Sequence, residues 1–394
     1  MIKSLPFLLI LSLITICIEV DISAPSFPDI SDYFNISEGL TQMTIGVNFF
    51  GFCLASVLYG PLSESFGRRS LMIYGNGLML IGAVCCSFAP TIEWLLVARF
   101  IQGLGASSSA VLAFAMVADV YSGHKATKLI GAMNSILTVF MSIAPVAGSF
   151  INQIIGWRGN YSVVASISVI SWLLLYFYLP ETKKSYQKLS INRIFADYWI
   201  LLFDKGFLYA ALVPSLCYSG YMCFIACAPF LYMETFDLTI TQYAIHQGVI
   251  LSSFSITSMY AGWISNKVGQ VNSIVYGVAT SLISGIMIVI VAITSENAPY
   301  LTTLSMVIFA ISSATYYPVV FARSMEIVPK LKGTASSFIM ALRMLMCGAF
   351  VAVTGYLYNG TLLPVSLIIF ISIVLLTVFT SKLLQLVSFA EDRV

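Results

Sequence analysis

Four charged residues stand inside long apolar stretches of the sequence: Glu19, Asp21, Arg99 and Arg343. A charge at the centre of a membrane helix costs about 2.5–3.5 kcal/mol on insertion scales, so it requires a partner or a water-filled cavity. These four residues are therefore the first candidates for the chemistry of the chain.

Asp21 is the group that we expect to carry a proton. Burial and a neighbouring arginine displace the titration of a carboxyl group in opposite directions, so together they can keep it in the working pH range. Exchange of a proton for a substrate at this group would couple two fluxes. The alternative is that Asp21 is a solvated charge at a helix end. Glu19 lies about 200° round the helix from Asp21, so it faces the Arg99 helix or a cavity, or serves as a structural partner.

The two arginines are expected to act as fixed positive charges. Arg99 cannot realistically deprotonate, so it could pair with Asp21 or Glu19, or instead clamp backbone carbonyls of the first span. Arg343, if it faces a cavity, would favour anionic or neutral substrates over cations. The alternative for Arg343 is that it snorkels toward the membrane surface or pairs within the second half of the chain.

A polar turn, Gly60-Pro-Leu-Ser-Glu-Ser-Phe-Gly-Arg-Arg-Ser70, separates two apolar runs. Glycines allow the close approach and the sharp turn that such a connection needs. The predicted cytoplasmic gate consists of Gly60, Glu64, Gly67, Arg68, Arg69 and Asp119. For Asp119, the alternative is an ordinary helix-terminus charge.

The composition requires lipid as the solvent. The chain has 394 residues, of which 59% are hydrophobic and 9% are charged, whereas a soluble domain carries about 25% charged residues. The net charge of +2 gives no reason to expect a nucleic-acid partner. The eight cysteines and two histidines show no metal-ligand spacing, so neither a metal nor a cofactor is expected.

A helix needs roughly 20 apolar residues to cross a bilayer. Twelve apolar runs in the sequence have about this length, and they predict an all-α membrane protein with twelve spans. Their approximate limits are 4–25, 41–63, 70–90, 93–120, 125–152, 157–179, 206–233, 239–264, 271–293, 298–325, 331–357 and 362–385. The longest connection is charged. The chain is thus expected to form two pseudo-symmetric six-helix halves, 1–180 and 206–394, joined by a cytoplasmic linker, 181–205.

The distribution of charge predicts that both termini are cytoplasmic, because basic residues accumulate on that side. The cations assigned to it are Lys3, Arg68, Arg69, Lys125, Lys128, Lys183, Lys184, Lys188, Arg193, Lys205, Lys267, Arg323, Lys330, Lys332, Lys382 and Arg393. The opposite side carries Arg158 and the acids Asp29, Asp32, Glu38, Glu93, Glu234, Asp237 and Glu296.

The two halves repeat each other. Gly60-Pro-Leu-Ser-Glu-Ser-Phe-Gly67 aligns with Gly262-Trp-Ile-Ser-Asn-Lys-Val-Gly269. Parallel repeats with a cavity between them are typical of secondary transporters. The second copy replaces the strong charges with Asn266 and Lys267, so the first half is expected to carry most of the gate.

Several motifs resemble those of the major facilitator superfamily. The polar turn resembles the loop between its helices 2 and 3, G-x-L-[SA]-[DE]-x-x-G-R-[RK]. Leu96-Val-Ala-Arg99-Phe-Ile-Gln102-Gly103-Leu-Gly105 resembles its buried arginine followed by Q-G-x-G. Ala144-Pro145-Val-Ala-Gly148-Ser149 resembles the G-P-x-x-G-G motif of the drug/proton antiporters, with two of its glycines replaced. Asp21-Ile-Ser-Ala-Pro25-Ser-Phe-Pro28 resembles a segment of the Bcr/CflA (bicyclomycin/chloramphenicol resistance) family.

The resemblance spans nearly the whole chain and implies a proton-driven multidrug exporter of the bacterial inner membrane. Its partners would be protons, a small-molecule substrate and the lipid bilayer, and it would act as a monomer. Pro145 and Gly148 would bear on the direction of exchange, or simply on helix packing. Phe50, Tyr218 and Tyr221 are candidates to line the substrate cavity together with Arg343.

Two other functions were weighed. Arg343, where this branch commonly has glutamine, and the altered glycines of the 144–149 motif keep open a carrier for a metabolite such as a siderophore, amino acid or sugar-like compound. An enzyme or a sensor is disfavoured, because no catalytic motif and no soluble domain is visible. The chain is predicted not to be an enzyme.

Overall fold

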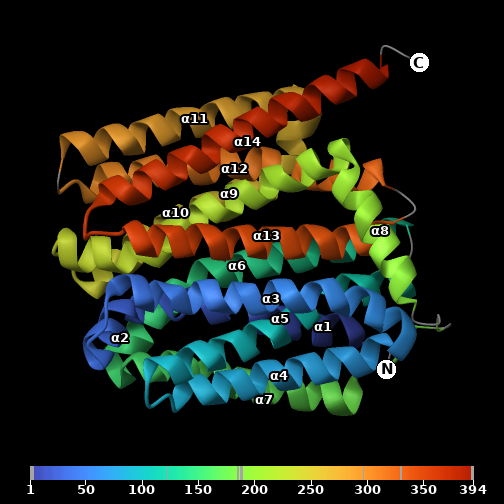
Figure 1. Cartoon of the computed structure of the whole chain (residues 1–394), viewed down its shortest axis with the longest axis horizontal. Helices are drawn as coiled ribbons and strands as arrows, with labels where there is room; N and C mark the ends of the chain where they lie inside the picture. The colour runs from blue at the N-terminus through green and yellow to red at the C-terminus, as the bar shows by residue number, and fades with distance from the viewer. Residues whose placement is uncertain are drawn as a thin grey trace.

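The computed structural model describes residues 4–121, 123–183, 186, 190–295, 297–328 and 331–391. Of the residues on which the orientation rests, Lys3, Lys184, Lys188, Glu296, Lys330 and Arg393 lie outside these ranges, as do the side chains of Lys125, Lys128, Arg193 and Lys332. Helices make up the described regular structure, and the long ones run in roughly the same direction (Figure 1).

The first-half helices, as we name α1–α7, begin with a composite segment. It consists of α1 (Leu5–Asp21), a 3-10 turn (Ala24–Ser26) and α2 (Phe27–Phe34). The others are α3 (Glu38–Phe66), α4 (Arg68–Ser87), α5 (Ile92–Val120), α6 (Gly123–Ile155) and α7 (Trp157–Tyr178).

The second-half helices, as we name α9–α14, follow a short helix, α8 (Ile191–Phe203). They are α9 (Lys205–Phe230), which ends in a π-helical turn (Leu231–Thr235), α10 (Ile240–Val268), α11 (Gln270–Thr294), α12 (Pro299–Ile327), α13 (Lys332–Leu357) and α14 (Leu362–Glu391).

Ten of these segments are long and apolar enough to cross a membrane, judged over the described residues. They are the composite first segment and nine single helices, namely α3–α5, α7, α9 and α11–α14. Two further helices, α6 with 33 residues and α10 with 29, are equally long. Ten and two give the twelve long helices that the apolar runs predict. The beginning of α1 and the end of α14 lie at the same end of the bundle, as an even number of crossings requires (Figure 1).

The predicted linker contains a helix that the sequence analysis did not anticipate. α8 lies across the end of the bundle where both termini are found (Figure 1). Its Phe195 and Trp199 are exposed, whereas Tyr198 donates a hydrogen bond to the carbonyl of Val57 at 2.9 Å and lies 6.2 Å from the ring of Phe338. Tyr198 therefore contacts both α3 and α13.

The repeated turns share one backbone conformation. Gly67 has φ 91° and ψ 151°, and Gly269 has φ 91° and ψ 148°. A positive φ of this kind favours glycine. Both glycines end one long helix and begin the next without a loop, so the sequence repeat is also a structural repeat.

α3 and α13 approach closely along their length. A Cβ atom added to Gly39 would lie 2.2 Å from the carbonyl oxygen of Gly355, and one added to Gly348 would lie 3.1 Å from that of Gly46. A Cβ on Gly60 would lie 2.5 Å from the Ser337 hydroxyl. Small residues thus permit backbone contact at both ends and in the middle of this α3–α13 seam.

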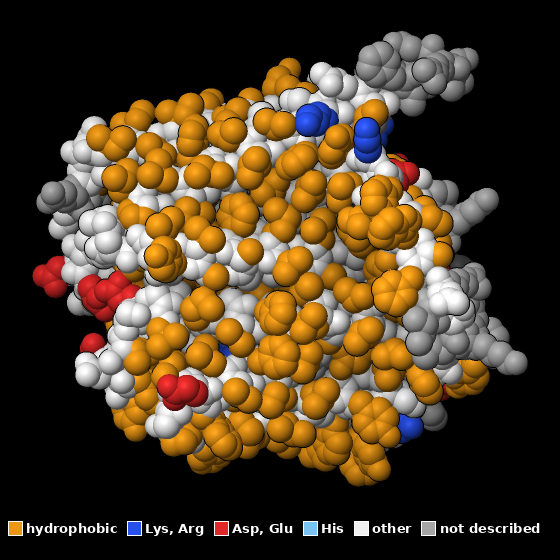
Figure 2. All heavy atoms as spheres, viewed as in Figure 1, with side chains coloured by type: hydrophobic (Ala, Val, Ile, Leu, Met, Phe, Trp, Pro, Cys, Tyr) orange, Lys and Arg blue, Asp and Glu red, His pale blue; other side chains and the backbone are white. Residues whose placement is uncertain are grey.

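Apolar side chains cover the middle of the bundle on the face shown in Figure 2. The acidic side chains on this face lie mostly at the end opposite the termini, and Lys and Arg side chains appear at the other end. We call these the acidic end and the basic end. This arrangement matches a lipid-covered belt between two polar surfaces.

Candidate functional site

Asp21 is the last residue of α1, where the first segment is interrupted. The Ser23 hydroxyl donates to the carbonyl of Val20 at 2.9 Å, and a 3-10 turn containing Pro25 follows before α2 begins. Proline removes a backbone donor and prevents a regular continuation of the helix. Interrupted helices of this kind are where transporters hold their substrates and coupling ions.

The two carboxyl groups of α1 have different surroundings, and each is 2% exposed. Glu19 accepts a hydrogen bond from the Asn48 amide of α3 at 3.4 Å, and its charge interacts with that of Arg99 on α5. Asp21 instead acts electrostatically on Tyr218, Tyr221 and Tyr243 of the second-half helices.

Arg99 is fully buried among the first-half helices. Its Nη1 donates to the Gln102 amide oxygen at 2.8 Å, and its guanidinium lies 5.8 Å from the centroid of the Tyr161 ring. Asn48 also donates to the backbone carbonyl of Arg99, at 3.1 Å. Among the described residues neither Glu19 nor Asp21 forms an ion pair with Arg99 within 4.0 Å. Glu19 is therefore the carboxyl group that interacts electrostatically with Arg99, without forming an ion pair within 4.0 Å in the described part of the chain.

Gly148 of α6 fixes the position of the interruption in the first segment. A Cβ atom at this position would lie 2.1 Å from the carbonyl oxygen of Ile22, directly after Asp21. Pro145 is buried within the same helix, and its carbonyl accepts a hydrogen bond from Ser149 at 2.9 Å. The proline-glycine segment therefore contacts the chain directly beside Asp21.

Arg343 of α13 lies half-buried against aromatic side chains. Its Nη1 donates to the Tyr317 hydroxyl at 2.5 Å, its Nη2 to the sulfur of Met340 at 2.8 Å, and its guanidinium lies 5.1 Å from the centroid of the Tyr218 ring. It also acts electrostatically on Cys17 of α1. Arg343 therefore lies between the first-half and the second-half helices.

The prediction for Phe50 requires a correction. Its ring is 47% exposed on the outside of the bundle, 6.2 Å from the ring of Phe100. The preceding residue, Phe49, is 3% exposed and lies 6.5 Å from the ring of Tyr218. Consecutive helical residues point about 100° apart, so the inward position belongs to Phe49. Tyr218 and Tyr221 are half-buried, and Tyr221 accepts a hydrogen bond from Gln247 at 3.3 Å.

The predicted gate residues meet at the basic end of the bundle. Arg68 donates to Glu64 at 2.5 Å, to Asp119 at 3.2 Å and to the Ser63 hydroxyl. Lys183 donates to Glu64, and the Thr182 hydroxyl donates to Asp119 at 3.0 Å. The cluster thus ties the ends of α3 and α5 and the beginning of α4 to the linker.

Arg69 makes a separate set of contacts. Its side chain donates to the carbonyls of Leu179 and Tyr176 at 2.8 Å each, while the Glu181 carboxylate accepts from the backbone amides of Arg68 and Arg69 at 3.1 Å each. All these partners belong to the first-half helices and the linker. In the described part of the chain no ion pair joins this cluster to α9–α14, and Gly60 is the member that touches Ser337 of α13.

Several residues of these clusters were not singled out as site residues from the sequence. Asn48 carried a signal, since it is an amide inside an apolar run. The sequence patterns assign no role to four further residues: Gln102 of the 96–105 motif, and Glu181, Thr182 and Lys183 of the predicted linker. Tyr317 carried no such signal, because 21 tyrosines occur in the chain.

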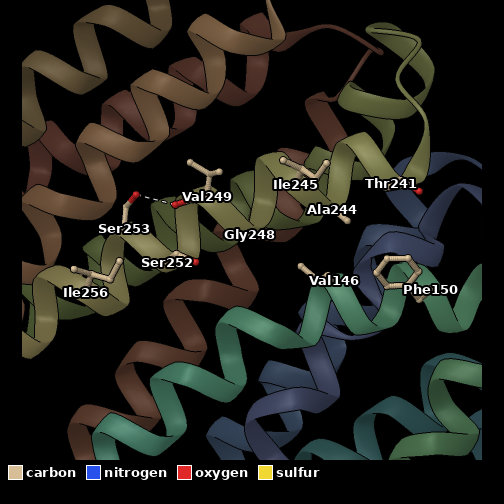
Figure 3. A pocket seen from close by; sticks show the side chains of 10 residues that line it. All are labelled: Val146, Phe150, Thr241, Ala244, Ile245, Gly248, Val249, Ser252, Ser253 and Ile256. Carbon is tan, nitrogen blue, oxygen red and sulfur yellow. Dashed lines mark hydrogen bonds between the residues drawn. The ribbon is translucent and has the colours of Figure 1, made fainter.

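A pocket among the described residues lies elsewhere, between α6 and α10 (Figure 3). Val146 and Phe150 of α6 face a stretch of α10 from Thr241 to Ile256, and a Cβ atom added to Gly248 would lie 3.4 Å from the side chain of Val146. The lining is mainly apolar, and Ile245 and Ile256 are exposed on the surface. This pocket thus lies between a first-half helix and a second-half helix, and Glu19, Asp21, Arg99 and Arg343 are not among its lining residues.

Comparisons with known proteins agree with this architecture. The profile of the Major Facilitator Superfamily matches residues 9–351. The uncharacterized MFS-type transporter YdgK of Bacillus subtilis is 26% identical over 381 residues, which cover 94% of this chain and 93% of that protein. A bicyclomycin resistance protein homolog of Haemophilus influenzae is 22% identical over 333 residues, 82% of each chain.

The fold is also that of a solved transporter. The xylose transporter XylE of E. coli, in a partially occluded inward-open conformation, superposes with a TM-score of 0.76 at 15% identity, with 97% of each chain covered. The predicted all-α membrane fold is confirmed, and the chain is a transporter rather than an enzyme. Since the family profile covers most of the sequence, the chain belongs to the Major Facilitator Superfamily.

Proposed function

We propose that the chain is a proton-coupled exporter of small amphipathic compounds, a drug:proton antiporter that works by alternating access. One observation carries the proposal: the carboxyl group of Asp21 is buried at an interrupted helix and faces tyrosines of the other half. A buried carboxyl group at this place can exchange its proton when the surroundings change. The similarity to a bicyclomycin resistance protein homolog supports the same branch of the family.

In this mechanism the moving units are residues 1–180 and 206–394, joined by the linker 181–205. Substrate enters between them from the basic end, which we place in the cytoplasm of a bacterium together with both termini. Asp21 takes up a proton on the outside as substrate leaves there, and releases that proton on the inside as new substrate binds. Arg99 supplies a fixed positive charge beside Glu19, and the Glu64–Arg68–Asp119 cluster holds the cytoplasmic ends of the first-half helices together.

The energy source in this proposal is the proton gradient, without a cofactor, and the monomer is the working unit. Each half brings its own part of the pathway: the carboxyl groups come from α1, whereas Tyr218, Tyr221 and Arg343 come from α9 and α13.

The test uses everted membrane vesicles and a pH-sensitive dye in the lumen. Wild type is compared with Asp21→Asn while chloramphenicol, bicyclomycin and other compounds are added. We expect substrate-dependent proton release from the lumen in wild type and none in the variant. An equal response in both proteins would remove Asp21 from the coupling site and leave Glu19 as the next carboxyl group to replace.

A second candidate function is transport of a metabolite such as a siderophore, amino acid or sugar-like compound. Arg343 favours it, because a guanidinium that forms no ion pair with a described carboxylate suits substrates with acidic or polar groups. In the same vesicles, proton release with none of the drugs but with such a metabolite would select this function.

A further inference from the structure

Arg343 differs from the buried arginines Arg68 and Arg99 in its counter-charge. Arg68 is paired with Glu64 and Asp119, and Arg99 lies within electrostatic range of Glu19. The groups that act electrostatically on Arg343 are the side chains of Tyr317, Tyr218 and Cys347, all without charge at neutral pH. In the described part of the chain no carboxylate lies within 4.0 Å of its guanidinium.

The hydrogen bonds of this guanidinium also leave capacity for a ligand. Its acceptors are a tyrosine hydroxyl and a thioether sulfur, and its buried Nε has no acceptor. An arginine carries five N–H donors in a planar fork that fits two oxygens of one acidic group. Since an intramembrane cation is costly without a counter-charge, binding an anion here removes that cost.

The neighbouring surface suits the remainder of such a ligand. Tyr218 lies under the guanidinium, and Phe49 of α3 lies 6.5 Å from the Tyr218 ring. Arg343, Tyr218, Tyr221 and Tyr317 are only half-buried, so each keeps part of its surface open to contact. The charge of Asp21 acts on Tyr218, over which Arg343 lies, so an acidic and a basic group border the same ring, and among the described residues they form no ion pair within 4.0 Å.

We propose that Arg343, with Tyr317 and Tyr218, forms a subsite for the acidic group of the transported compound, a carboxylate, sulfonate or phosphate. The aromatic part of that compound packs on Tyr218 and Phe49, and a positive group, where present, points to Asp21. The substrate class is therefore aromatic acids and aromatic zwitterions rather than lipophilic cations. The claim that this compound is transported rests on the proposed function, whereas the claim that Arg343 binds an acidic group does not.

The test is equilibrium binding to the full chain in lipid nanodiscs with no proton gradient. The probes are two matched pairs: dansylglycine and its methyl ester, and chloramphenicol succinate and chloramphenicol. Because charge-assisted hydrogen bonds contribute about 1.5–3 kcal/mol, wild type should prefer the acidic member by on the order of tenfold or more. Arg343→Gln should lose this preference without weaker binding of the uncharged member, and Arg343→Lys should keep part of it.

Arg158→Gln is the matched control, since Arg158 also lies on aromatic rings, 4.4 Å from the Tyr33 centroid, but belongs to the first half. This variant should keep the full preference. The proposal is overturned if wild type shows no preference in either pair, or if Arg343→Gln retains it. If the acidic probes bind more tightly but no proton release occurs in vesicles, the subsite stands and the proton-coupled exporter mechanism is wrong. If uncharged drugs cause proton release and neither probe pair shows a preference, the exporter mechanism stands and the subsite is wrong.

Discussion

At the scale of single residues, the first span separates two carboxyl groups by placing them on different faces of one helix. Glu19 turns toward Asn48 and Arg99 within the first half, whereas Asp21 turns toward tyrosines of the second half. A group whose neighbours move relative to it can change its protonation during transport, and a group held within one rigid set of helices cannot do so as readily. This difference favours Asp21 for proton transfer and Glu19 for support of Arg99.

Replacement of Arg99 tests the supporting role of Glu19. Arg99→Met removes the positive charge that interacts with the buried carboxyl group of Glu19, and a buried charge without a counter-charge destabilises the fold. We therefore expect a lower thermal unfolding midpoint, measured in detergent or nanodiscs. The double variant Arg99→Met, Glu19→Gln removes both charges and should recover much of the loss. Equal destabilisation of the single and double variants would show that Glu19 and Arg99 are not coupled.

At the scale of helices, close contacts between backbones position the site. α6 touches the chain beside Asp21 through Gly148, and α3 touches α5 beside Arg99, where a Cβ atom on Gly103 would lie 2.0 Å from the carbonyl oxygen of Asn48. These distances leave no room for a side chain, because an added Cβ would overlap backbone atoms that cannot turn away. Glycine at these places therefore sets where the charged groups lie.

Gly148→Ala tests this positioning. The added methyl group would collide with the carbonyl of Ile22, so the segment after Asp21 must shift at a cost of about 1–3 kcal/mol. Substrate-dependent proton release in everted vesicles should fall strongly. Gly262→Ala is the matched control, because a Cβ atom at that position meets nothing within 4 Å. Full activity of Gly148→Ala would show that the contact with Ile22 does not position Asp21.

At the scale of the whole molecule, the α3–α13 seam and α8 bring the two halves together at the basic end. Gly60 touches Ser337, and nearby Tyr198 contacts Val57 of α3 and Phe338 of α13. The ion pairs of the described gate residues stay within the first half and the linker. Opening of this end therefore has to break the contacts of Gly60 and Tyr198 and can leave the ion pairs intact.

A reversible cross-link tests this opening. A Cβ atom on Gly60 lies 3.5 Å from the Cβ of Ser337, a separation within the range of about 3.5–4.5 Å seen in disulfides. Gly60→Cys with Ser337→Cys, in a chain whose eight native cysteines are replaced by alanine or serine, should lose transport on oxidation and regain it on reduction. Each single cysteine variant serves as a control. Undiminished transport by the oxidised protein would mean that this contact does not separate.

The sequence was sufficient to predict the twelve long helices, because their length and apolarity are set by the bilayer and Gly67 and Gly269 mark sharp turns. It did not predict α8, since an amphipathic stretch of 13 residues falls below the length of a span. Nor did it predict which of Phe49 and Phe50 faces inward. In a helix that is apolar all round, lipid and protein interior accept the same side chains, so its rotation is not encoded in the pattern.

The contacts of the α3–α13 seam are unequally spaced, so a rotation about the middle contact would move the two ends of the seam by different distances. If the two helices rotate about the contact of Gly46 and Gly348, the arm from Gly46 to Gly60 is about 21 Å, and the arm from Gly46 to Gly39 is about 10 Å, at 1.5 Å per residue. A given rotation would then separate the end of the long arm about twice as far as the end of the short arm. The opening at the basic end would then admit bulkier molecules than the opening at the acidic end.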